Sequence, residues 1–168
     1  MKITETKNLV IKELNTGDAD FILELVNDPD WINFIGDRGV KTKKQASKYI
    51  LDRHVKSYLD HGFGLYVVKI KGKDIPIGIC GLVKRSGLED VDIGFAFLPQ
   101  YRGKGYAYES AIAVLNYARI ELGIHRVVAI TSPENEPSAR LLERLGLKFD
   151  KLIKLPNQEE DSCLFIPA

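Results

Sequence analysis

The segment that connects the central strands of this chain to a long predicted helix has the sequence Pro99-Gln100-Tyr101-Arg102-Gly103-Lys104-Gly105-Tyr106-Ala107. Its two glycines let the backbone come close to a ligand. The free N–H groups of a first helical turn, together with the helix dipole, attract an anion. Arg102 and Lys104 add positive charge at the same place. We therefore expect this segment to bind a phosphate group.

Two well-known phosphate motifs do not fit this segment. A Walker A loop has Ser or Thr directly after Gly-Lys, whereas Lys104 is followed by Gly105. A Rossmann fingerprint needs a third Gly or Ala where this chain has Tyr108, and it opens a parallel fold. A tight turn with two solvated cations stays open as an alternative.

The first third of the chain is predicted to be mostly helical after one strand. Alternating apolar residues indicate a strand over Leu9–Leu14, and helical spacing follows at Phe21, Ile22, Leu25 and Val26. Pro29 ends this helix, and an irregular stretch follows. Thr42 is expected to cap a second helix that ends at Gly62. The apolar face of that helix is predicted to comprise Ala46, Tyr49, Ile50 and Leu59.

The middle of the chain is predicted to be an antiparallel meander with strands Phe63–Ile70, Ile75–Val83 and Val91–Leu98. Side chains alternate along a strand, so Val91, Ile93, Phe95 and Phe97 are expected to face the core. The opposite face then carries only small residues and one carboxylate, in Asp92, Gly94 and Ala96.

The last third is predicted to continue the sheet. A helix begins at Gly105, a buried strand covers Val127–Ile130, and Asn135 caps a helix closed by Gly146. A strand pair, Leu147–Leu155 and Cys163–Ile166, completes the chain. We therefore predict an α+β fold with a central, mixed, mostly antiparallel sheet flanked by helices, as a single domain over residues 1–168.

Composition excludes several kinds of protein. The 24 basic and 23 acidic residues leave a net charge of +1, which does not favour nucleic acid or a membrane surface as a partner. Cys80 and Cys163 lack the spacing of a disulfide framework or a zinc site, and His54, His61 and His125 lack that of a metal site. No apolar run approaches the ~18 residues of a membrane span. We expect a soluble cytoplasmic protein without a metal.

Two segments together resemble one enzyme family. Gln100, Arg102, Gly103, Lys104 and Gly105 match motif A of the GNAT superfamily of acetyl-coenzyme-A-dependent N-acetyltransferases. The helix from Asn135 to Gly146 resembles the second signature of that family. The residues from Tyr106 to Ala111 resemble its RimJ/RimL-type branch, which includes ribosomal-protein N-terminal acetyltransferases. The resemblance covers nearly the whole chain.

The resemblance implies acetyl-coenzyme A as the co-substrate and a set of residues that bind it. These are Phe97, Leu98, Gln100, Arg102, Gly103, Lys104, Gly105, Tyr106, Ala107, Asn135 and Ser138. The pantetheine arm would pair with the strand that ends at Leu98. That strand and the one that starts near Arg126 must then splay apart, and a backbone N–H near Phe97 or Leu98 would polarise the thioester.

Acetyl transfer to an amine needs a base and a proton source for the leaving thiolate. Asp92 is the first candidate for the base, with a surface carboxylate as the alternative, and Glu109 is the second. Leu142 stands where many family members have a tyrosine, which rules out that acid. Ser138 resembles the serine that the RimL-type branch places near the sulfur, with a polar residue of the first helical turn as the alternative. Cys80 is expected to be a core residue, so we expect direct attack in a ternary complex. A catalytically silent coenzyme-A-binding regulatory module remains the alternative.

The acceptor site is expected in the helical first third. Trp31 and Phe34, with Asp92, are the predicted substrate-binding residues, and the nearby Asp28, Asp30 and Asp37 would suit a cationic amine. Each is also compatible with a helix-end charge or a core aromatic. The expected acceptor is a primary amine, either a ribosomal or other protein N-terminus or a polyamine or antibiotic. The expected assembly is a monomer or homodimer.

Overall fold

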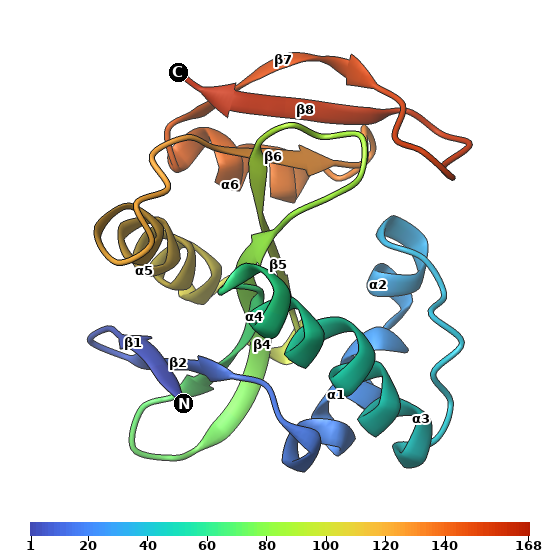
Figure 1. The fold of residues 1–168 in the computed structure, drawn as a ribbon, viewed down its shortest axis with the longest axis vertical. Coiled ribbons are helices and arrows are strands. Elements are labelled where there is room, and N and C mark those ends of the chain that lie inside the picture. Colours follow the sequence, from blue (N-terminus) through green and yellow to red (C-terminus); the bar gives the residue numbers. More distant parts are fainter.

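The computed structural model describes residues 1–168 and contains one eight-stranded sheet between two groups of helices (Figure 1). The strands lie in the order β1-β2-β3-β4-β5-β6-β8-β7, and only β5 and β6 run parallel. Their bounds are Lys2–Glu5, Leu9–Glu13, Leu65–Ile70, Ile75–Val83, Val91–Phe97, Val127–Thr131, Leu147–Ile153 and Ser162–Pro167 for β1 to β8. The predicted mixed, mostly antiparallel sheet is confirmed.

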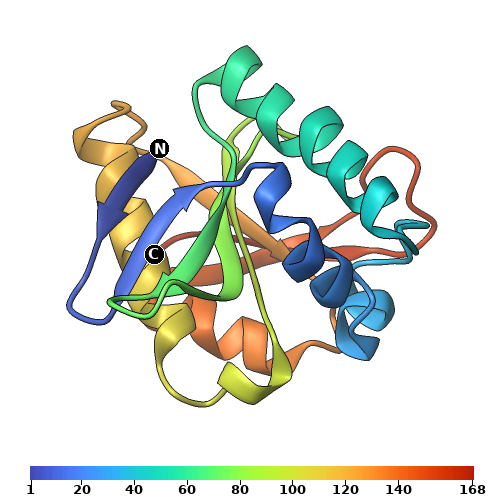
Figure 2. The same ribbon diagram turned by 90° about the horizontal axis from the view of Figure 1, so that it is seen from below.

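The helices cover both faces of the sheet. The first group comprises α1 (Ala19–Val26), α2 (Pro29–Phe34), α3 (Lys43–Tyr49) and α4 (Lys56–His61), and the second comprises α5 (Tyr106–Ile120) and α6 (Glu136–Arg144). Figure 2 shows the two groups on opposite sides of the strands. No helix is both long and apolar enough to cross a lipid bilayer.

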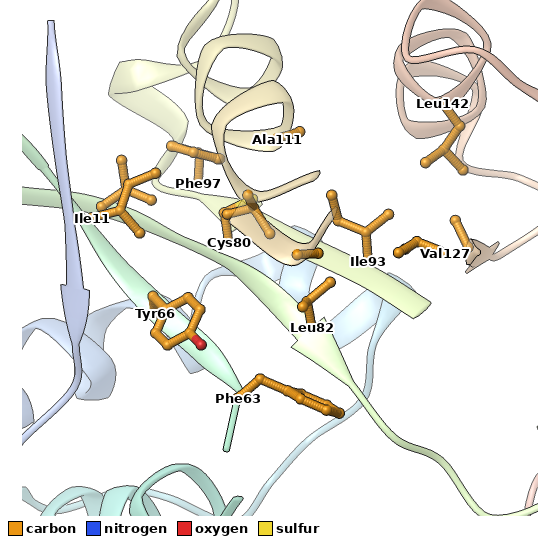
Figure 3. Packing of buried hydrophobic residues seen from close by; sticks show 14 of the residues in the cluster. Ile11, Phe63, Tyr66, Cys80, Leu82, Ile93, Phe97, Ala111, Val127 and Leu142 are labelled. Carbon is orange, nitrogen blue, oxygen red and sulfur yellow. The ribbon is translucent and has the colours of Figure 1, made fainter. Parts of the chain in front are cut away.

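Two hydrophobic clusters fill the space between these layers. One packs α5 and α6 against the sheet and includes Phe97, Cys80 and Leu142 (Figure 3). The other packs α1 to α3 against the opposite face, where Ala96 contacts it. The alternative that Asp92 is a surface carboxylate was therefore wrong, because helices of the first third cover this face of β5. Asp92 is only 1% exposed.

The helical run from α3 to α4 begins and ends as predicted but differs in its middle. Thr42 and Gln45 form a reciprocal cap, with N–H to oxygen distances of 3.1 Å in both directions, and Gly62 ends α4 at φ 79°. A π-helical stretch, Ile50–Val55, lies between α3 and α4. Ala46 of α3 and Ile50 and His54 of this stretch are four residues apart and all buried, so one face of the run stays in the core. Leu59 is 81% exposed, and its predicted burial was wrong.

The parallel strands β5 and β6 separate after two residue pairs, as the resemblance requires. Val91 pairs with Val127 and Asp92 with Val128, and the remainder of β6 pairs only with β8, on its other edge. Figure 1 shows the two strands diverging. The Leu98 N–H donates to the Ile77 carbonyl at 3.0 Å, and hydrogen bonds alternate along an antiparallel pair. The N–H and C=O of Phe97 therefore point away from β4, into the gap beside β6.

Candidate active site

The turn before α5 has the geometry of an anion site. Gly103 and Gly105 adopt left-handed conformations with φ values of 72° and 84°, which favour glycine. No atom lies within 4 Å of a Cβ built on either residue, so the turn is open on that side. The N–H groups from Gly103 to Tyr108 donate to no protein acceptor. This row of free donors stands at the N-terminus of a 15-residue helix.

Arg102 ties this turn to the first group of helices. Its Nε donates to the Phe97 carbonyl at 3.0 Å, and its terminal nitrogens pair with Asp28 at 2.7 Å and with Asp30. Asp37 pairs with Lys41 at 3.3 Å and accepts from the Gly39 N–H, and these contacts lower its pKa. The three carboxylates expected to attract a cationic amine are therefore engaged within the protein. That expectation is not supported by the structure.

A cavity of about 580 Å³ opens beside the turn, and we call it the donor cavity. The predicted residues in its wall are Trp31, Phe34, Phe97, Arg102, Gly103, Gly105, Tyr106, Ala107, Asn135 and Ser138. Leu98, Gln100 and Lys104 do not line it. The Leu98 side chain is buried in the second hydrophobic cluster, and the other two are exposed.

Four cationic or aromatic residues of the donor cavity were missed by the sequence reasoning. They are Tyr101, Tyr108, Arg140 and Arg144. The guanidinium of Arg144 lies 4.4 Å from the centre of the Tyr108 ring. The i, i+4 spacing of Arg140 and Arg144 on the predicted helix was the available signal, since it puts both charges on one helix face.

A smaller cavity of about 170 Å³, the inner cavity, adjoins the donor cavity at the gap between β5 and β6. The two share Trp31, Phe34, Ile35, Phe95, Ala96, Asn135 and Ser138 as wall residues. Asp92 lines only the inner cavity. The structure thus brings the two predicted catalytic residues, Asp92 and Ser138, to one cavity.

Two other groups at this junction have informative hydrogen bonding. The Asn135 side chain accepts from the Ser138 N–H at 3.3 Å, which confirms that it caps α6. The buried indole N–H of Trp31 has no acceptor in the protein. Buried donors are normally paired, so a ligand in these cavities is a reasonable partner for it.

Burial and an ion pair shift the pKa of Asp92 in opposite directions. Burial raises its pKa to about 6, and the charge and hydrogen bonds of Arg85 limit the rise. The Arg85 Nε donates to both carboxylate oxygens at 3.1 and 3.2 Å. A carboxylate of this kind is ionised at neutral pH and basic enough to accept a proton.

Glu109, Cys80 and His54 are the other side chains considered as catalytic or metal-binding candidates. Glu109 accepts from the Thr6 hydroxyl and from the Asn8 backbone at 3.0 Å, which joins the β1–β2 turn to α5, so it is not placed to act as the base. Burial raises the pKa of Cys80 to about 12, in keeping with a core residue. His54 was expected not to bind a metal, because it lacks the spacing of a metal site. It is buried without a partner for Nε2, and burial with nearby arginines lowers its pKa to about 3.

The family follows from comparison with known proteins. The family profile described as "Acetyltransferase (GNAT) domain" matches residues 8–148, and the chain belongs to this acetyltransferase family. Enzymes with the GNAT fold use acetyl-coenzyme A. The predicted family is confirmed.

Individual relatives agree with this assignment. A Bacillus subtilis (strain 168) protein named "Uncharacterized N-acetyltransferase YnaD" is 32% identical over 92% of this chain and 86% of its own length. The crystal structure of a GNAT-family acetyltransferase from Bacillus anthracis is 27% identical with a TM-score of 0.79, over 99% of this chain and 97% of that one. RimL, a ribosomal L7/L12 alpha-N-protein acetyltransferase solved with coenzyme A, has a TM-score of 0.82 over 99% of this chain and 97% of its own. Its 14% identity shows a common fold alone.

Proposed function

We propose that this protein transfers an acetyl group from acetyl-coenzyme A to a primary amine by direct attack in a ternary complex. The observation that carries the proposal is the shared wall of the donor and inner cavities, with Asp92 on one side of the junction and the anion-binding turn on the other. We take residues 1–168 as one catalytic domain that works in the cytoplasm.

The donor is proposed to bind along the turn and the open side of β5. The free N–H groups from Gly103 to Tyr108 would hold the pyrophosphate, and Arg102, paired with Asp28 and Asp30, would hold the turn in position. The pantetheine arm would pair with the backbone of Phe95 and Phe97, which faces the gap. Phe97 is the better oxyanion donor of the two residues first considered, because the Leu98 N–H already bonds to Ile77.

The chemistry is proposed to need two side chains. Asp92 would accept the proton of the attacking amine, directly or through water. Ser138 would donate a hydrogen bond to the leaving thiolate, in place of the tyrosine that Leu142 replaces. Direct transfer fits the burial of Cys80, since its raised pKa disfavours a thiolate that could carry the acetyl group.

The acceptor class is proposed by analogy. RimL is named for acetylating the α-amino group of a ribosomal protein. A protein N-terminus or a small-molecule amine would both supply the nucleophile that the inner cavity needs.

Thiol release from acetyl-coenzyme A in the presence of a panel of amines tests this proposal. Asp92→Asn is expected to lower kcat/KM by about a hundredfold or more, and Ser138→Ala by about tenfold. Asp90→Asn and Ser47→Ala are matched controls, since Asp90 pairs with Arg126 outside both cavities and Ser47 lies on α3.

Two results would contradict parts of the proposal. Wild-type rates in both variants would remove these residues from the mechanism. Thermal stabilisation by acetyl-coenzyme A without acetylation of any amine would instead favour the catalytically silent module.

A further inference from the structure

Three arginines from separate parts of the chain line the inner cavity. Arg38 lies in the connection between α2 and α3, Arg53 in the π-helical stretch, and Arg85 in the connection after β4. Asp92 is the only carboxylate in the same wall. The cavity is therefore positively charged, although the whole chain is nearly neutral.

Most of the guanidinium donors in this wall have no partner. The side chains of Arg38 and Arg53 form no hydrogen bond or ion pair within the chain. Arg85 uses only its Nε on Asp92, which leaves its terminal amino groups free. Burial lowers the pKa of Arg53, and the charges of Arg38 and Arg85 lower it further. Like charges gathered in this way repel one another, and an anion between them would relieve the repulsion.

A third cavity of about 480 Å³, the outer groove, leads to this cluster from the side away from the donor cavity. It shares Leu65, Val83, Gln158, Arg53 and Arg85 with the inner cavity and no residue with the donor cavity. Its two carboxylates are engaged, Asp60 with Lys56 at 2.6 Å and Asp52 with Lys48. An acceptor that enters here meets uncompensated positive charge before it reaches Asp92.

We propose that the acceptor amine carries an anionic group, a carboxylate or a phosphate, that Arg38, Arg53 and the terminal amino groups of Arg85 bind. The amine of the same molecule would lie beside Asp92. This inference rests on the proposed function and specifies its acceptor. It disfavours polyamines, whose several positive charges would be repelled by the same arginines.

Matched pairs of amines that differ only in charge provide the test. L-serine against L-serinamide tests an α-carboxylate of a free amino acid, and the dipeptide amides Ser-Glu and Ser-Gln test a side-chain carboxylate near a peptide N-terminus. O-phosphoethanolamine against ethanolamine tests a phosphate, and spermidine represents the polyamines. Thiol release gives kcat and KM, and calorimetry gives binding of each amine to the protein saturated with coenzyme A.

The expected result is a preference of about tenfold or more in kcat/KM for the anionic member of at least one pair. Arg38→Gln and Arg53→Gln should each remove most of that preference, through KM rather than kcat. Arg119→Gln, on the surface of α5 and outside all three cavities, should retain it.

The outcomes separate this inference from the proposed function. Equal rates within every pair, or spermidine as the best acceptor, would overturn the inference and leave the acetyltransferase proposal intact. Binding of the anionic amines without turnover would overturn the proposed function and, with it, the role of the bound amine as acceptor, and only anion binding by the arginines would stand. If the anionic amines neither bind nor react, the inference is wrong.

Discussion

Asp92 derives its chemistry from its position where β5 and β6 are still paired. It lies at the closed end of the gap, is shielded from water by the helices of the first third, and contacts a single cation. The same carboxylate on a solvated strand would have an ordinary pKa near 3.8, too low for efficient proton removal at neutral pH. Burial therefore turns a common side chain into a candidate base.

The pH dependence of kcat/KM should reveal this group. The amine must be neutral to react, so log kcat/KM should rise with a slope of about one between pH 6 and the pKa of the amine. Below pH 6, Asp92 is protonated as well, and the slope should approach about two. In Asp92→Asn the slope should stay near one, whereas Asp90→Asn should keep the wild-type profile. An unchanged break near pH 6 in Asp92→Asn would assign it to another group.

Asp92 also makes the stability of the folded protein depend on pH. Its pKa in the folded protein, about 6, exceeds the ordinary 3.8, so the folded state binds this proton more tightly than the unfolded state does. The resulting contribution to stability is present at low pH and is lost as the pH rises through about 6.

At the scale of elements, the turn and α5 form one unit for anion binding. Gly105→Glu should weaken coenzyme A binding by about tenfold or more, because a carboxylate at this position would repel the pyrophosphate. Gly123→Glu is a matched control. Gly123 also has positive φ and open space around it, so the backbone strain, about 1 kcal/mol, is similar at both sites. Calorimetry measures affinity and thermal unfolding measures stability; equal affinity in both variants would exclude the turn as the binding site.

Elements with strong local signals were predictable from sequence. The strands β3 to β5 have regular alternation and clear turns, and the caps at Thr42 and Asn135 follow from side chains that accept hydrogen bonds from the next helical turn. The first strand, β1, was missed because it is short and polar, and because the turn that follows it is held by Glu109, which lies far along the chain. The π-helical stretch was missed because buried residues four apart, such as Ile50 and His54, fit an α-helix equally well.

At the scale of the molecule, the donor side of the site was more predictable than the acceptor side. The donor turn is one contiguous segment, so its glycines and its helix are visible together in the sequence. Arg38, Arg53 and Arg85 come from three segments that only the folded chain brings together. The pairing of Arg102 with Asp28 and Asp30 likewise joins residues that local patterns cannot relate.

The gap between β5 and β6 also gives the donor a structural role in the sheet. A strand with unpaired backbone groups normally lies at the outside of a sheet, whereas here such an edge lies in the middle. If the pantetheine arm pairs with it, hydrogen exchange of the Phe95 and Phe97 amides should slow on adding coenzyme A. The amides of Gly94 and Ala96 point toward β4 and serve as internal controls; equal slowing of all four, or of none, would contradict this pairing. The donor would then act as a removable ninth strand, and an enzyme molecule without it would contain an unfinished sheet.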